Sequence, residues 1–375
     1  DDDNSGLGDW FVNEKKLGGT LGNLIKRIND LGVKFGIWIE PEMVCEDSDL
    51  YREHPDWAFT IPGRKPVRAR YQLVLDYSRK EVVDGIFTQI AKVLDETKAD
   101  YVKMDMNRHL TDVWSKTAGE QNQGAILHRY MLGVYDFLER LHERYPALLI
   151  EGCSGGGGRF DAGMLYYTPQ IWCSDNTDAI ERVKIQYGTS FAYPSCTVGS
   201  HVSAVPNHQT GRTTELATRA AVAMAGSFGY ELDLNLLTEE KEQVRAQIKN
   251  YHRFEMLIRQ GRYYRLTDVW QKKEYAAWEY CRPDGSEALV TVVTLDTQCN
   301  PATEYVKLRG LGEDKKYRVE VVGMQTGGEN GQRINGTPNS IEPEYFTGAQ
   351  LVYAGVPVPR LGNEYKSWQV YVKEV

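Results

Sequence analysis

Apolar positions up to about residue 260 alternate between short continuous runs and segments in which they recur every three or four residues. The runs are typical of buried strands and the recurring positions of helices, so their alternation indicates a parallel α/β architecture. Ser78 and Glu81 match a capping box and predict the start of one helix. The pattern predicts strands at 33–39, 71–75, 101–106, 148–151, 170–174 and 197–202, with further helices at 21–31, 126–144, 212–225 and 239–258.

The number of predicted strands bears on the fold class. A closed (β/α)8 barrel needs eight parallel strands, and this pattern supplies about six. The chain opens on Asp1-Asp2-Asp3-Asn4, without a Met or a signal peptide. We therefore expect an α/β protein of the (β/α)8 TIM-barrel class that lacks its first strands in this chain, cut from a longer protein.

The pattern of residue types along the chain changes from about residue 275. Segments rich in β-branched and aromatic residues are separated there by turn signals at 283–285, 327–328 and 330–331. They predict strands at 275–280, 287–295, 316–322 and 368–372. We therefore predict two domains, a partial (β/α)8 barrel at residues 1–265 and a C-terminal antiparallel β-sandwich at residues 266–375.

The amino-acid composition limits the kinds of partner and the cellular setting that we expect for this protein. The net charge of −8 argues against nucleic acid or an anionic membrane as the main partner. The chain has no apolar run long enough to span a membrane. None of the 6 cysteines stands in CxxC spacing, which predicts reduced thiols and a cytoplasmic setting.

Residues that carry chemistry gather at the ends of the predicted strands. In barrels of this class the active site lies at the carboxyl ends of the strands. Carboxylates, amides, a lysine, a tryptophan and a glycine-rich loop follow those ends, a set that suits a polyhydroxylated substrate. They are Trp38, Glu40, Glu42, Asp76, Lys103, Asp105, Asn107, the loop 152–158, Asp175, Asn176, Asp178 and His201.

Two of these carboxylates fit the demands of glycoside hydrolysis. That reaction needs one carboxyl group that attacks, or activates water, and a second that protonates the leaving oxygen. Asp105 and Asp175 come from separate strand ends and can supply this pair. Lys103 points to the same side of its strand as Asp105, and its ammonium would favour the ionised form of Asp105.

Each residue also has a plainer interpretation. A strand-end Asp is more often a helix cap, and Lys103 with Asp105 can be an ion pair or half of a metal site. Trp38 can be a core residue and Cys153 a small buried one. The loop 155–158 lacks the spacing of a phosphate-binding motif, and the histidines lack metal-ligand spacing. The sequon at Asn335 is of a kind that arises by chance.

Six motifs follow one another along the chain: 7–10 (LGDW), 38–44 (WIEPEMV), 70–76 (RYQLVLD), 103–108 (KMDMNR), 151–159 continuing to 172–179 (WCSDNTDA), and 199–203 with 206–209. In this order they resemble glycoside hydrolase family 36, the bacterial-type α-galactosidases. The resemblance runs from residue 1 to about 260 and continues weakly through the C-terminal domain.

The resemblance implies double displacement with retention at the anomeric carbon, and no metal or organic cofactor. Asp105 would be the nucleophile and Asp175 the acid/base, with Asp178 behind the pocket. The substrates would be α-galactoside oligosaccharides such as melibiose, raffinose and stachyose, and the parent protein a homo-tetramer. The residues implied in binding galactose are Trp38, Arg70, Lys103, Asn107, Cys153 and Gly156.

This sequence departs from the family in two ways. Met104 stands where the family often has Trp. An N-terminal β-sandwich and an Asp pair that grips the galactose 4- and 6-hydroxyls are not in this chain.

Four other functions stay open on the sequence. The same intermediate serves a transglycosylase, and an α-N-acetylgalactosaminidase would bind a larger 2-substituent, against which Cys153 argues. A non-catalytic galactoside-binding fragment would follow from the missing part. A metal-dependent lyase would use Lys103 and Asp105, with Glu42, Asp76 and Glu151 as ligands.

Overall fold

The computed structural model describes residues 5–299, 302–322, 344–358 and 364–375. The chain divides into two compact units, Asp1–Trp172 and Cys173–Val375, and each is described by itself. The turn signals at 327–328 and 330–331 and the sequon at Asn335 lie outside the described residues.

The first unit is built on four parallel strands in the order β1-β4-β5-β6. Trp38 is in register with Lys103, and Lys103 with Glu151, so these three side chains lie on one face of the sheet. The order leaves one strand, β5, between the strands that precede Asp105 and Asp175, as predicted. The strands are β1 (Gly36–Ile39), β4 (Tyr101–Met104), β5 (Leu149–Gly152) and β6 (Gln170–Trp172).

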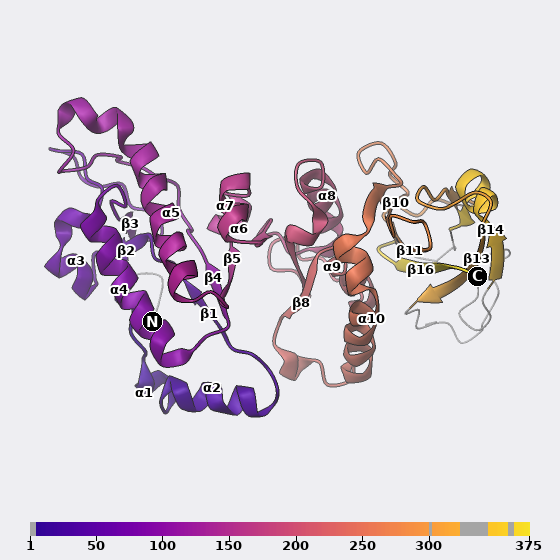
Figure 1. Cartoon of the computed structure of the whole chain (residues 1–375), viewed down its shortest axis with the longest axis horizontal. Coiled ribbons are helices and arrows are strands. Elements are labelled where there is room, and N and C mark those ends of the chain that lie inside the picture. The colour runs from indigo at the N-terminus through magenta and orange to yellow at the C-terminus, as the bar shows by residue number, and fades with distance from the viewer. Residues whose placement is uncertain (1–4, 300–301, 323–343, 359–363) are drawn as a thin grey trace. The chain divides into compact units, whose positions relative to one another are not determined.

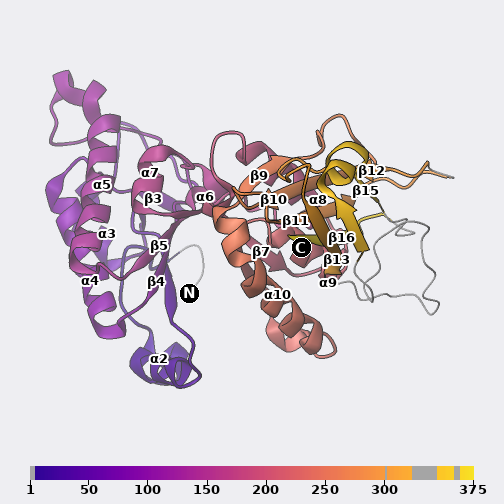
Figure 2. The ribbon, with the colours of Figure 1, turned by 45° about the vertical axis from the view of Figure 1, so that its right-hand side comes forward.

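Helices α4 and α5 lie side by side in this unit (Figure 1), and Figure 2 shows them next to β4 and β5. Val82 and Ile86 of α4 and Phe137 of α5 are fully buried in the core, as the helical spacing of apolar residues predicts. The helices are α1 (Glu14–Leu17), α2 (Leu21–Asp30), α3 (Asp49–Glu53), α4 (Lys80–Thr97), α5 (Ile126–Arg144), α6 (Ser154–Gly157) and α7 (Ala162–Tyr167), with η1 (Pro55–Trp57) and η2 (Glu120–Ala125).

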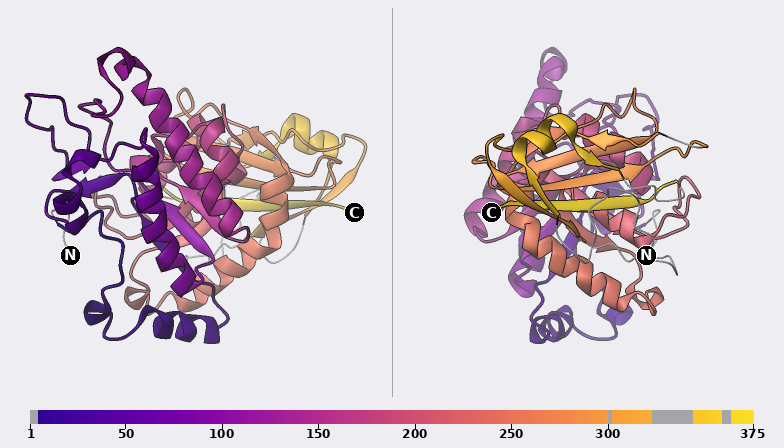
Figure 3. Two further views of the ribbon diagram at one scale, coloured as in Figure 1. Left: turned by 60° about the vertical axis from the view of Figure 1, so that its left-hand side comes forward. Right: turned by 90° about the vertical axis from the view of Figure 1, so that its right-hand side faces the viewer.

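The second unit contains the parallel pair β7 (Val198–Ser203) and β8 (Ser227–Glu231). It also holds a six-stranded antiparallel sheet in the order β14-β13-β16-β11-β10-β9, and Figure 3 shows α10 beside it. Phe254 of α10 packs on Tyr371 of this sheet, with ring centroids 5.1 Å apart. A second, two-stranded sheet pairs β12 with β15.

The remaining bounds of the second unit are these. The strands are β9 (Arg262–Arg265), β10 (Tyr275–Cys281), β11 (Glu287–Thr294), β12 (Tyr305–Val306), β13 (Lys316–Val322), β14 (Glu344–Thr347), β15 (Val356–Pro357) and β16 (Ser367–Glu374). The helices are α8 (Ala179–Thr189), α9 (Leu216–Ala223) and α10 (Lys241–Gln260), with η3 (Ser195–Thr197), η4 (Leu234–Leu236) and η5 (Gln350–Ala354).

The predicted fold class is confirmed: parallel strands with helices are followed by antiparallel sheets. One strand assignment is wrong, because β3 (Gln72–Val74) pairs antiparallel with β2 (Met43–Cys45) in a separate two-stranded sheet. The sixth parallel strand is instead β8, which the sequence did not predict. Its residues, SFGYE, do not form a continuous apolar run, and none of them is fully buried.

The predicted capping box at the start of α4 is also wrong. The helix begins after Arg79, which makes no side-chain cap bond. The Ser78 hydroxyl donates to the carboxylate of Asp76, and Glu81 accepts from Arg79 Nε at 2.8 Å. Both side chains of the expected box are therefore engaged elsewhere.

Within the described residues, the search for a helix with the length and apolar character of a membrane span found none.

Candidate active site

Asp105 lies directly after β4, in the first unit, and only 7% of its surface is exposed. Its Oδ1 accepts hydrogen bonds from the backbone N–H of Met106 at 2.8 Å and of Gly155 at 3.1 Å. Its Oδ2 accepts from Asn107 Nδ2 at 2.8 Å and Trp38 Nε1 at 3.3 Å. Four N–H donors from three strand ends therefore surround one carboxylate.

These donors set the protonation state of Asp105. Burial alone would raise its pKa. Hydrogen bonds from the Gly155 backbone, the Asn107 amide, the Cys153 thiol and the Met106 backbone outweigh burial, and the pKa of Asp105 lies below its ordinary value. The carboxylate is thus held in the ionised form that a nucleophile requires.

The glycine-rich loop supplies one of the donors because of its backbone conformation. Ser154, Gly155, Gly156 and Gly157 have φ of 59°, 61°, 77° and 89°, a continuous left-handed stretch. Side chains with a Cβ rarely adopt this conformation, whereas glycine does so at little cost. The run of glycines therefore lets the Gly155 N–H point at Asp105.

Cys153 opens this loop and is buried. Burial, and then the charge of Asp105, raises the pKa of the Cys153 thiol to about 12, although the Gly156 backbone N–H opposes the rise. A thiol that stays protonated is a hydrogen-bond donor rather than a nucleophile. The structure thus favours a neutral Cys153 next to Asp105.

Lys103 contacts a different carboxylate from the one the sequence suggested. Its Nζ lies 3.4 Å from Glu151 Oε1 and 4.6 Å from the centroid of the Trp172 ring. The fully buried Glu151 also accepts from the Tyr101 hydroxyl. The largest causes that lower the pKa of Asp105 are therefore hydrogen bonds from neutral donors, while the ion pair of Lys103 is with Glu151.

Two other predicted site residues, Trp38 and Arg70, have exposed side chains. Trp38 is 44% exposed, so it is not a core residue of the described chain. Arg70 and Tyr71 precede β3 and have φ of 52° and 59°, a left-handed pair without glycine. Such strained pairs are found more often at functional sites than elsewhere.

Asp175 belongs to the second unit, where it is exposed. Its backbone carbonyl accepts from Gln209 Nε2 at 3.2 Å, and the next residue, Asn176, donates its N–H to Ser174 Oγ at 3.1 Å. The segment that carries Asp175 is thus held by its own turn and by a second loop.

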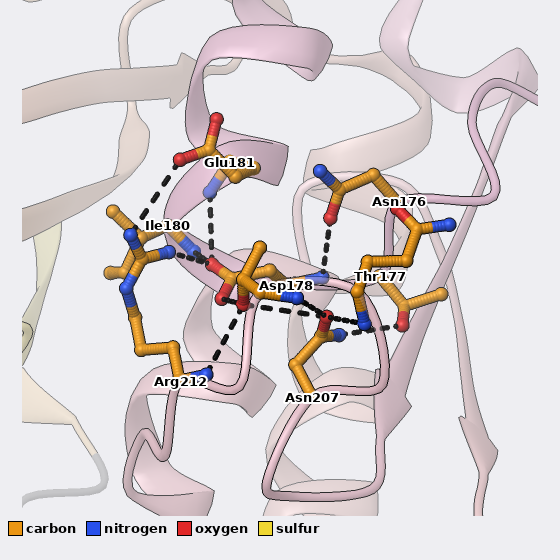
Figure 4. A network of polar contacts seen from close by, with 9 residues as sticks. Asn176, Thr177, Asp178, Ile180, Glu181, Asn207 and Arg212 are labelled. Carbon is orange, nitrogen blue, oxygen red and sulfur yellow. Dashed lines mark hydrogen bonds and ion pairs between the residues drawn. The ribbon is translucent and has the colours of Figure 1, made fainter.

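That second loop is fixed through Asp178, as Figure 4 shows. Asp178 caps α8, its Oδ1 accepting the N–H groups of Ile180 at 2.8 Å and Glu181 at 3.1 Å. Its Oδ2 accepts from the Thr210 hydroxyl at 2.6 Å, and Arg212 Nη1 forms an ion pair with Oδ1. The Asp178 carboxylate is therefore fully engaged and positions the loop that bears Asp175.

A network that holds the glycine-rich loop was missed in the sequence analysis. Arg159 donates from Nη1 and Nη2 to the two oxygens of Glu42, at 2.7 and 2.9 Å. Glu42 is fully buried and also accepts from the Tyr130 hydroxyl. Burial lowers the pKa of Arg159, but the Glu42 charge outweighs it and keeps the pKa above its ordinary value. The pair ties the end of the 155–158 loop to the segment after β1.

Replacing Arg159 with methionine is expected to destabilise the fold by about 3–5 kcal/mol, because Glu42 stays buried without its cation. Urea unfolding of the two proteins measures this difference. A Glu42→Leu, Arg159→Met double variant should recover part of the loss, since neither charge then remains buried. Arg140→Met, which removes a partly exposed pair with Asp84, is the control and should cost about 0–1 kcal/mol. A cost as small for Arg159→Met would contradict the prediction.

The lyase hypothesis requires a set of metal ligands among the described residues. Among the described residues, no group of three or more His, Cys, Asp and Glu is arranged to hold a metal ion. The carboxylates available to the lyase hypothesis have other partners: Glu42 binds Arg159, Glu151 pairs with Lys103, and Asp76 accepts from Ser78.

A barrel-type fold with an ionised carboxylate at its strand ends is typical of glycoside hydrolases. Two family models match the chain, Melibiase over residues 1–261 and the Glycosyl hydrolase family 36 C-terminal domain over residues 275–372. The chain therefore belongs to the melibiase family.

Named relatives agree with this family. The chain is 56% identical over its whole length to the bifunctional alpha-galactosidase/sucrose kinase AgaSK of Mediterraneibacter gnavus, and 46% identical to alpha-galactosidase AgaA of Geobacillus stearothermophilus. It covers 37% of the first relative and 49% of the second. The chain thus spans about half the length of these relatives, or less.

Solved structures share the fold. The galactosidase domain of AgaSK superimposes with a TM-score of 0.90 at 56% identity, over 100% of this chain and 48% of that one. A substituted AgaA in complex with raffinose gives a TM-score of 0.91 at 44% identity, over 100% and 49%. Another substituted AgaA, at the same TM-score of 0.91 and coverage of 100% and 49%, is in complex with stachyose.

Proposed function

We propose that the protein containing this chain is an α-galactosidase, which releases terminal α-1,6-linked galactose from oligosaccharides of the melibiose and raffinose type. The observation that carries the proposal is the Asp105 carboxylate, ionised and surrounded by four N–H donors after β4. The names of the relatives, and the raffinose and stachyose bound to AgaA, support galactosides as the substrate class.

In the proposed mechanism, Asp105 attacks the anomeric carbon and the leaving oxygen takes a proton from Asp175. The resulting β-galactosyl ester is then hydrolysed by water, which gives its proton to Asp175. Two inversions return the α-configuration. The donors to Asp105 fix its orientation and keep it ionised before attack.

We propose six residues for galactose binding. Trp38 offers an exposed ring and Lys103 an ammonium on the same face of the sheet. The buried Cys153 thiol lies next to Asp105, and we propose that it faces the sugar 2-position, where it favours the small hydroxyl of galactose over a 2-acetamido group. The set is Trp38, Arg70, Lys103, Asn107, Cys153 and Gly156.

We further propose domains at residues 1–265 and 266–375, a homo-tetrameric parent protein and a cytoplasmic location. The family models, whose matches end at 261 and begin at 275, support the boundary. The cysteines Cys45, Cys153, Cys173, Cys196, Cys281 and Cys299 are all free thiols, in keeping with a reducing compartment. Size-exclusion chromatography with light scattering tests the oligomeric state.

The function is tested by following raffinose hydrolysis with ¹H NMR, using the protein as its gene encodes it. The first galactose to appear should be the α-anomer, which then mutarotates to the equilibrium mixture. p-Nitrophenyl α-N-acetylgalactosaminide and p-nitrophenyl β-galactoside are the control substrates and should be cleaved far more slowly. Absence of galactose would refute the function, and β-galactose as the first product would refute the double displacement.

A further inference from the structure

Glu40 is a buried carboxyl group with no role in the mechanism described so far. It directly follows β1, and only 1% of its surface is exposed. Its Oε1 accepts the backbone N–H of Asn107 at 2.6 Å. Removing a carboxyl group from water costs free energy unless its interactions compensate. The hydrogen bond with Asn107 is one such interaction.

The contact belongs to a closed set of hydrogen bonds between two strand ends. The Asp105 N–H donates to the carbonyl of Ile39 at 2.8 Å, and Asn107 Nδ2 donates to Asp105 Oδ2 at 2.8 Å. Residues 39 and 40 therefore hold the backbone N–H groups of the candidate nucleophile, Asp105, and of Asn107, two residues further on. Moving the Asn107 backbone would move the amide that donates to Asp105.

We propose that Glu40 is a positioning residue for the candidate nucleophile, whose carboxyl fixes the backbone of Asn107 and thereby aims the Asn107 amide at Asp105. The inference rests on the proposed function, since it assigns Glu40 to the same reaction. Glu40 acts through Asn107 and takes no part in bond making.

The groups around Glu40 shift its pKa in the opposite direction to that of Asp105, so the two carboxyl groups do not compete to be the ionised one. Burial raises the pKa of Glu40, as does the charge of Asp105, while the hydrogen bonds of Asn107 and the charge of Arg70 lower it, and the net direction is upward. The pKa of Asp105 is shifted downward. The two neighbouring carboxyl groups are thus driven apart, so Asp105 ionises first.

Three substitutions separate these roles in the protein as its gene encodes it. Glu40→Gln keeps a carbonyl oxygen for the Asn107 N–H, so kcat should stay within about threefold of the wild type. Glu40→Met removes the acceptor, and Glu40→Asp withdraws it by one methylene with less risk to folding. Both should lower kcat by about 10²-fold, because the nucleophile is misplaced. Both should also move the acidic limb of the kcat/KM profile to higher pH, because Asp105 loses a well-aimed donor.

The matched control is Glu279→Met. Glu279 is fully buried in the antiparallel sheet, where it accepts the N–H groups of Arg309 at 2.8 Å and Gly310 at 3.1 Å. Its replacement should lower the melting temperature and leave KM and the acidic limb unchanged. An unmoved acidic limb in both Glu40→Met and Glu40→Asp would overturn the inference alone. A wild type that releases no galactose would overturn the proposed function and this inference together.

Discussion

Replacing Asp105 with glycine should lower the hydrolysis of p-nitrophenyl α-galactoside by about 10⁴-fold or more, the scale of loss expected when a nucleophile is removed. The four N–H donors then face an empty space instead of a carboxylate. Azide is small and anionic, so it can occupy that space and be bound by the same donors. Added azide should restore turnover and yield β-galactosyl azide, formed by a single inversion.

The measurement is release of p-nitrophenol with and without azide, with the sugar product identified by NMR. Asp47→Gly is the matched control, because Asp47 is an aspartate with 72% of its side chain exposed. It should retain wild-type activity and show no response to azide. A folded Asp105→Gly protein with near-normal activity, or α-galactosyl azide as its product, would remove Asp105 from the nucleophile's role.

The arrangement around Asp105 follows from parallel strands, and this part was accessible from the sequence. Apolar runs identified β1, β4 and β5, and parallel strands bring their carboxyl ends to one edge of the sheet. Trp38, Asn107 and the glycine-rich loop were therefore expected near Asp105, and hydrogen bonds join all of them to it. Which atom donates to which oxygen was not predictable.

The strand error has a physical cause. The segment 72–74 is fully buried, and a short buried run has the same sequence pattern in a parallel and an antiparallel sheet. Its partner β2 comes from the WIEPEMV motif, only a few residues after β1, and nothing local marks it as a strand of a different sheet. β8 was missed for the opposite reason, since its residues are only partly buried and Gly229 packs against the ring of His201.

Charge partners were the least predictable feature. Period-two alternation correctly sets Lys103 on one face of β4, but it does not say which neighbour the ammonium will reach. The register places Glu151 directly beside Lys103 on the adjacent strand, 48 positions along the chain (151 − 103 = 48). Glu40 was noted as a strand-end carboxylate, yet its role depends on a contact with Asn107 that only the folded chain creates.

Asp175 should produce a different pattern of loss from Asp105. Asp175→Ala should lower kcat for raffinose by about 10³-fold, within the range typical of general acid catalysis. The first step on 2,4-dinitrophenyl α-galactoside should change little, because that leaving group departs without a proton. The galactosyl ester should then accumulate, since water lacks its base, and azide should release it as α-galactosyl azide.

The measurement is the burst of dinitrophenol in a stopped-flow experiment, together with the steady-state rate on raffinose. Asp178→Ala is the control, because it removes the cap of α8 and the anchor of Thr210 and Arg212 without touching the Asp175 side chain. A displaced loop should slow the natural and the activated substrate alike. Only loss of the proton donor makes the defect depend on the leaving group. Equal losses of Asp175→Ala on both substrates would therefore assign Asp175 a structural role and leave the acid to another carboxyl group.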